Sequence, residues 1–195
     1  MRAHLRFALA AALVAAAALP ASAQQPATAA NPNTPALAND LLRDIGQLER
    51  KMMALARAIP AEKYNWKPAE GVRSVGEVLL HVAADNYLLP AALGYTPDAA
   101  TGIKGDDYKT AQAFESRKLD RDATIAELEK SFAFLRASLT ATTQAKLGEQ
   151  VSLFGQKFSG QQTWIMTATH LHEHLGQMIA YARANGVTPP WSQGG

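Results

Sequence analysis

No cysteine occurs among the 195 residues of the chain. The absence excludes disulfide bonds, thiolate metal ligands and haem attachment through a CxxCH motif. It also excludes the lipid-modified type of export signal, because a cysteine carries the lipid in that type.

A charge excess of one sign is also missing from most of the chain. The net charge is +2, and Arg2 and Arg6 near the N-terminus supply it. Residues 24–195 contain 17 basic and 17 acidic side chains. Such a neutral domain lacks the basic field that attracts nucleic acid, so we predict no nucleic-acid partner.

The N-terminus has the pattern of a cleaved secretory peptide. The segment MRAHLRFALAAALVAAAALPASAQQ has a basic start, an apolar stretch from Phe7 to Leu19 and the small residues Ala21-Ser22-Ala23. A membrane anchor is the alternative, but thirteen apolar residues fall short of the roughly 20 that span a bilayer. We therefore predict a signal peptide over residues 1–23 and a periplasmic or secreted location. No later segment is long and apolar enough to span a membrane.

The residues after the predicted cleavage site divide into a leader and one helical domain. Residues 24–35 are small, polar and proline-bearing, which predicts a flexible leader. In residues 36–195, apolar side chains at three- and four-residue steps predict helices from Ala36 to the proline at position 60 and over about 120–140. The S-x-x-E capping box at Ser74 predicts a second helix that runs to about Leu89 and ends at Pro90.

The remaining segments complete an all-α domain. A second capping box at Ser159 predicts a long last helix that ends at Asn185-Gly186. The glycine-bearing residues 91–119 predict a long connection with one short helix, and VSLFGQKF predicts a turn or hairpin. Four amphipathic helices with almost no strand signal predict a four-helix bundle in which the long connection makes a crossover.

The last predicted helix contains the run THLHEHLGQ, with three of the five histidines. At about 100° per residue, His170 and His174 point about 40° apart onto one face, whereas His172 points away. Two imidazoles one helical turn apart can chelate a metal ion. The alternatives are hydrogen-bonded core histidines or a solvated face.

His81 strengthens the prediction of a metal site. It lies in the apolar segment GEVLLHVAADNYLL, with Glu77 and Asp85 one turn away on either side. Burying this polar stripe without partners would cost several kcal/mol, which a metal ion or a closed hydrogen-bond network would offset. If the second and last helices are neighbours, His81 completes a site of three histidines with His170 and His174.

Three imidazoles suit a divalent ion such as zinc, nickel or iron(II). They also leave a coordination position for water or substrate, as catalytic sites do. The spacing fits neither the Glu-x-x-His motifs of di-iron bundles nor HExxH. Asp85 is a candidate to orient a ligand or act as a base, and Gln177 is a candidate to orient a ligand imidazole. The sequence assigns no catalytic residue.

The segments SVGEVLLHVAADNYLL, preceded by YNWKP, and HLHEHLGQMIAYARANGVTPPWS resemble the DinB superfamily of metal-binding four-helix bundles. That family has one histidine in its second helix and an HxxxH pair in its last, commonly followed by Gly-Gln. The resemblance covers Ala36 to Ser192 and implies the metal ligands His81, His170 and His174. An arginine often follows the last ligand in the family, but Leu175 stands here, so no role that depends on that arginine is assigned.

The resemblance favours a metal-dependent hydrolase or transferase, because its characterised members include thiol S-transferases and a maleylpyruvate isomerase. The shared chemistry is a divalent metal that lowers the pKa of a bound thiol or activates water. A non-enzymatic periplasmic protein that binds metal or a small ligand is the second hypothesis, and a structural bundle without metal is the third. The expected partner is a small-molecule substrate or ligand, and a homodimer is one option for the assembly.

The signal peptide can be tested by mass spectrometry. In a Gram-negative host, the exported protein is expected to begin at Gln24, because Ala21-Ser22-Ala23 provides the cleavage site. Periplasmic protein that still begins at Met1 would contradict cleavage and favour the membrane anchor.

Overall fold

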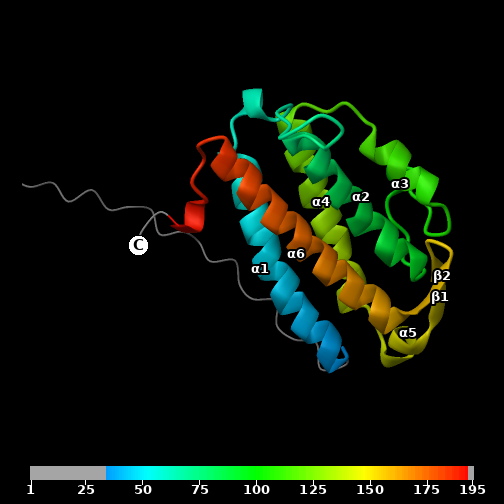
Figure 1. Ribbon diagram of the computed structural model, residues 1–195. Coiled ribbons are helices and arrows are strands. Elements are labelled where there is room, and N and C mark those ends of the chain that lie inside the picture. Colours follow the sequence, from blue (N-terminus) through cyan, green and yellow to red (C-terminus); the bar gives the residue numbers. More distant parts are fainter. Residues whose placement is uncertain (1–33, 193–195) are drawn as a thin grey trace, which may run out of the picture.

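The computed structural model describes residues 34–192 as a helical bundle (Figure 1), and the predicted signal peptide lies outside these residues. The long helices are α1 (Ala36–Ala58), α2 (Val75–Ala92), α4 (Arg121–Thr140) and α6 (Gly160–Ala184). Shorter elements are α3 (Tyr108–Glu115), α5 (Gln144–Gly148) and the antiparallel strands β1 (Gln150–Leu153) and β2 (Gln156–Ser159). The predicted all-α bundle is confirmed. Within residues 34–192, no helix combines the length and the apolar character needed to cross a membrane.

The four long helices enclose one core. α1 and α2 each pack against both α4 and α6. The core is filled by large apolar side chains, the largest fully buried ones being Trp164, Phe132, Ile45, Leu48, Met52, Leu55, Ile59, Leu79, Leu88, Leu93, Leu128 and Leu135.

The long connection predicted between the second and third long helices is a crossover, as expected. Asn86 donates to Ser131 Oγ at 3.1 Å, and farther along both chain segments the hydroxyls of Tyr95 and Thr142 are 2.9 Å apart. α2 and α4 therefore run in the same direction. Parallel neighbours need a connection that returns along the bundle, and residues 93–120 make this return with α3 beside α2 (Figure 1).

Both predicted capping boxes are present. Ser74 and Glu77 exchange side-chain and backbone hydrogen bonds at the start of α2, and Ser159 and Gln162 do the same at the start of α6. These bonds satisfy backbone NH groups that a helix start leaves unpaired.

The predicted end of the second helix at Pro90 is wrong, because α2 continues through this residue to Ala92. A proline removes one intrahelical hydrogen bond and is most disruptive in a helix interior. Here the helix ends two residues later, and the NH groups of Leu93 and Tyr95 donate to the Pro90 carbonyl. The single lost bond is therefore confined to the last turn.

α2 is the most deeply enclosed helix. Every residue from Val78 to Pro90 is buried, because α4, α6 and α3 all pack against this helix. The connection approaches α2 closely at Gly105, where an added Cβ would lie 2.2 Å from the Ala91 carbonyl carbon. Glycine at this position lets the loop before α3 lie directly against the end of α2.

The segment VSLFGQKF forms the predicted hairpin. Its two turn residues, Phe154 and Gly155, have φ angles of 53° and 75°. Two positive φ angles in a two-residue loop are characteristic of a type I′ turn, whose twist matches that of the flanking strands.

Candidate metal centre

Three histidines converge between α2 and α6. His81 projects from α2, and His170 and His174 project from adjacent turns of α6. One ring nitrogen of each lies within 4.8 Å of the other two. The ring centroids are 4.4 to 5.1 Å apart. α2 and α6 are thus neighbours, and the structure brings together the three residues that the sequence indicated.

Hydrogen bonds orient two of the three rings. His81 Nδ1 lies 2.9 Å from Glu115 Oε1, and His174 Nδ1 lies 2.8 Å from Gln177 Oε1. An acceptor at Nδ1 favours the tautomer with the proton on that nitrogen, which leaves the Nε2 lone pair free to bind a metal.

The amide of Gln177 is itself held in place. Its Nε2 donates to the Tyr181 hydroxyl at 3.1 Å, and that hydroxyl donates to the Arg73 carbonyl at 3.1 Å. This chain of donors leaves the amide oxygen to face His174. Gln177 therefore contacts the imidazole of His174, one of the three candidate ligands.

Asp85 lies beside the histidines. Its Oδ2 is 2.7 Å from His170 Nε2 and 3.5 Å from His81 Nε2. His170 Nε2 and Asp85 Oδ1 are each buried without a hydrogen-bond partner among residues 34–192. A buried carboxylate oxygen and a buried imidazole nitrogen that lack partners are costly. A cation bound by His170 Nε2 would satisfy this nitrogen and offset the charge of the adjacent carboxylate, so the donor set fits a metal ion.

Glu115 was not identified from the sequence. It lies at the end of α3, in a stretch without a helical pattern long enough to place one face against α2. Its second carboxylate oxygen accepts a hydrogen bond from Arg73 at 3.0 Å. Burial raises the pKa of Glu115, but the hydrogen bonds and charges of His81 and Arg73 outweigh it and hold the pKa below its ordinary value. Glu115 is therefore a carboxylate that can keep His81 in the ligand tautomer.

The buried position of His174 favours its neutral form. Burial lowers the pKa of this imidazole, and the nearby His170 and His81 lower it further, while the hydrogen bond with Gln177 opposes the shift. Neutral imidazole is the form that binds metal ions.

His172 lies outside the cluster, as its place on the helix predicted. Its Nε2 is 2.8 Å from Asp44 Oδ2 on α1, and its side chain is 53% exposed. Glu77, the other acidic residue of the polar stripe on α2, caps the helix and pairs with Lys67 at 2.8 Å. The hydrogen bond from Lys67, followed by that from the Ser74 NH, lowers the pKa of Glu77 to about 2.

The family of the chain is shown by comparison with known proteins. Residues 45–178, more than half of the chain, match the model of the DinB superfamily. The chain belongs to this superfamily. A DinB-superfamily chain with three converging histidines and adjacent carboxylates can hold a metal ion.

Individual relatives share the fold at low sequence identity. The uncharacterised protein YjoA of Bacillus subtilis is 25% identical over 138 residues, which are 69% of this chain and 81% of the relative. A DinB-like protein of Bacillus cereus superposes with a TM-score of 0.63 at 16% identity, over 77% of this chain and 93% of that one. A mycothiol-dependent maleylpyruvate isomerase superposes with a TM-score of 0.61 at 13% identity, over 72% of this chain and 60% of that one.

The contact between Glu115 and His81 predicts that removing this carboxylate weakens metal binding. Replacing a group that orients a metal-bound imidazole typically costs about 10–100-fold in affinity. We expect Glu115→Ala to bind zinc more weakly by this factor in a competition titration with a chromophoric chelator.

Glu127 offers a matched control, because its side chain is 15% exposed against 14% for Glu115 and it also pairs with an arginine, Arg117. Glu127→Ala is expected to leave zinc affinity unchanged. Equal affinities in the two variants would contradict the role of Glu115.

Proposed function

We propose that this DinB-superfamily chain binds one divalent metal ion through His81, His170 and His174 and acts as a metal-dependent enzyme on a small molecule, of hydrolase or transferase type. The observation that supports it is the convergence of three imidazoles, two of them buried and that of His170 half-buried, beside the buried Asp85 carboxylate. Zinc, nickel and iron(II) all suit such a set of donors.

The number of protein ligands favours chemistry over a purely structural role. Structural metal sites are usually closed by four protein side chains, whereas three leave a position for water or substrate. A divalent ion held here would lower the pKa of a bound water or thiol.

Asp85 is the side chain that we propose as the general base of the site. Its Oδ1 is buried and has no hydrogen-bond partner within residues 34–192, while its Oδ2 contacts His170. A carboxylate with one free oxygen beside the reacting position can accept a proton from a water or thiol. We assign Asp85 this role in addition to orienting His170.

Water and thiols are both candidates for the reacting group. The structural likeness to a mycothiol-dependent isomerase makes a thiol one candidate. We also propose that residues 1–23 direct the chain out of the cytoplasm. An exported protein is separated from the thiol cofactors of the cytosol. Export therefore favours hydrolysis, or transfer to another acceptor, over transfer to such a thiol.

Metal analysis of site variants tests this function. The chain without a histidine tag is expected to carry about one equivalent of divalent metal, and His81→Ala or His174→Ala is expected to lose most of it. His172→Ala is the matched control and should retain the metal, because His172 pairs with Asp44 outside the cluster. Equal loss in all three variants would contradict the assigned ligands.

Turnover by metal-loaded protein with a panel of thiol and ester substrates then separates an enzyme from a non-enzymatic metal binder.

A second prediction couples the metal to stability. An ion at about 100 times its dissociation constant adds roughly 2.7 kcal/mol to the free energy of unfolding. We expect a chelator to lower the melting temperature by several degrees at neutral pH, with helical circular dichroism retained at 25 °C. Metal-loaded protein whose melting temperature does not change when the ion is removed would contradict this coupling.

The chelator effect should decrease toward pH 5, since protons compete with the ion for imidazole. The metal-free chain also has a defined pH dependence. The pKa of His174 is lower in the folded chain than in the unfolded chain, whose histidines titrate near ~6.5. The folded chain favours the neutral imidazole of His174, so this residue contributes to the free energy of unfolding above pH ~6.5. The contribution is lost as the pH falls below this value, because the unfolded chain then binds the proton more readily.

A further inference from the structure

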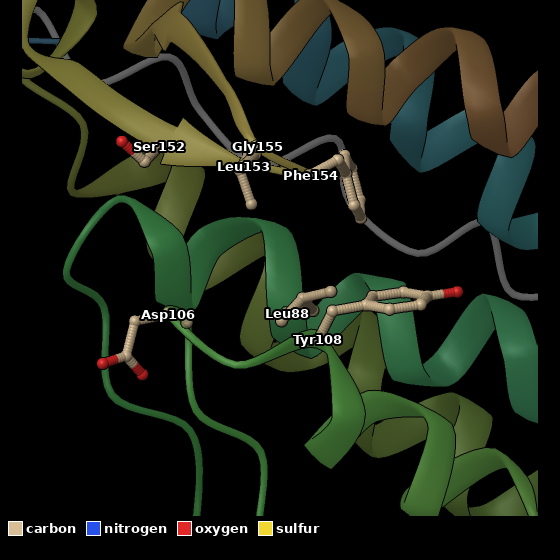
Figure 2. A pocket seen from close by; sticks show the side chains of 8 residues that line it. Leu88, Asp106, Tyr108, Ser152, Leu153, Phe154 and Gly155 are labelled. Atoms are coloured by element: carbon tan, nitrogen blue, oxygen red, sulfur yellow. The ribbon is translucent and has the colours of Figure 1, made fainter.

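Two aromatic side chains that the metal site does not use are exposed next to a cavity. Tyr108, the first residue of α3, is 38% exposed, and Phe154, at the tip of the β1–β2 hairpin, is 52% exposed. Their ring centroids are 5.4 Å apart and the rings are nearly perpendicular. They border a cavity of about 270 Å³ between the hairpin tip and the loop before α3, with Leu88 of α2 completing its wall (Figure 2).

The conformation of Phe154 argues against an incidental exposure. Its φ angle of 53° lies in the left-handed region, which costs a residue with a Cβ about 1–2 kcal/mol. Turns of this type favour Asn-Gly or Asp-Gly, and here the second position is a glycine, as expected. The first position holds a large aromatic residue instead of a small polar one. Strain of this kind at an exposed position is a reason to look for a function.

Helix α2 connects the cavity to the candidate metal centre. Leu88 lies three residues after Asp85 and seven after His81, so all three share one face of the helix. At 1.5 Å per residue, the cavity wall at Leu88 lies about 5 Å along the helix from Asp85 and about 10 Å from His81.

Helix α3 makes the same connection on the other side. Tyr108 and Glu115 are seven residues apart and therefore share a face, and Glu115 contacts His81. Burial raises the pKa of the Tyr108 phenol, and the negative charges of Glu115 and Asp85 raise it further, against the opposing charge of Arg73. The phenol is thus within electrostatic range of both carboxylates of the site. Figure 2 shows that the hydroxyl oxygen of Tyr108 points away from Asp106, another residue that lines the cavity.

We propose that Phe154 and Tyr108 form a binding subsite for an aromatic or similarly flat apolar group of the small molecule whose polar end reaches the metal centre. This inference rests on the proposed function, because the centre supplies the other end of the ligand. The substrate class is then a molecule with a metal-binding polar head and an apolar arm that spans roughly 5–10 Å, the axial separation of Leu88 in the cavity wall from Asp85 and His81.

Two hydroxamic acids test the subsite with zinc-loaded full-length protein. Acetohydroxamic acid carries only the metal-binding head, whereas 3-phenylpropanohydroxamic acid adds a phenyl ring on a short arm. We expect isothermal titration calorimetry to show that the phenyl compound binds about tenfold more tightly, the gain typical of burying one ring between aromatic side chains. Phe154→Asn should reduce this advantage to about twofold or less and leave the affinity for acetohydroxamic acid unchanged.

The choice of asparagine separates binding from folding. Asparagine is favoured at the first position of this turn, so the melting temperature of Phe154→Asn should equal or exceed that of the unaltered chain. Trp191→Ala is the matched control, since Trp191 is 42% exposed and its ring lies 5.6 Å from Lys51 Nζ of α1. The segment Pro190–Ser192 that contains it lies on the opposite side of the bundle from the hairpin (Figure 1). This variant should keep the full phenyl advantage.

The outcomes separate the two proposals. If acetohydroxamic acid binds and the phenyl ring brings no advantage, or if the advantage survives in Phe154→Asn, the subsite is wrong while the metal site stands. If neither compound binds to protein that contains zinc, both the open metal site and the subsite that depends on it are wrong. A lowered melting temperature in Phe154→Asn with an unchanged phenyl advantage would assign Phe154 a purely structural role.

Discussion

The burial of a polar stripe on α2 is the constraint on which the site depends. His81 and Asp85 are 7% and 8% exposed, because three other helices pack around this one. An ionisable group without solvent must find partners or change its protonation state. The contacts of the centre provide such partners: Glu115 pairs with His81, and Asp85 faces His170. Two buried atoms without a hydrogen-bond partner within residues 34–192, His170 Nε2 and Asp85 Oδ1, belong to this centre, where a cation would bind the nitrogen and offset the carboxylate charge.

The crossover connection contributes more than a link between two parallel helices. Its helix α3 lies along α2 and presents two residues on one face, Tyr108 toward the cavity and Glu115 toward His81. A segment that the topology requires thus also builds one wall of the site. Gly105 makes this possible, since a larger residue would collide with the backbone at the end of α2.

The chemistry of this chain depends on its own site residues, since it shares the fold with relatives at low sequence identity. Four-helix bundles carry many functions, and function depends on the residues at the site. In this chain those residues are three imidazoles and a carboxylate with a free oxygen, and an exposed aromatic pair borders a cavity whose wall includes Leu88 of α2.

Local patterns in the sequence determined much of the architecture. Helical periodicity and the capping boxes at Ser74 and Ser159 placed the long helices, because these signals depend on backbone geometry within a few residues. The same geometry put His170 and His174 on one face and His172 on another. The predicted helix end at Pro90 is wrong, since the cost of a proline within a helix depends on how near the helix end lies.

Only the tertiary structure decided which distant side chains meet. Glu115 contacts a histidine 34 residues earlier in the chain, and no periodicity in the connection indicates this pairing. The same holds for Phe154 and Tyr108, which come from a hairpin and from the start of a short helix. Sequence patterns report the face of an element on which a residue lies, whereas the partner across a gap depends on how the elements pack. For this reason the three histidines could be named from the sequence, but the groups that orient them and border the adjacent cavity could not.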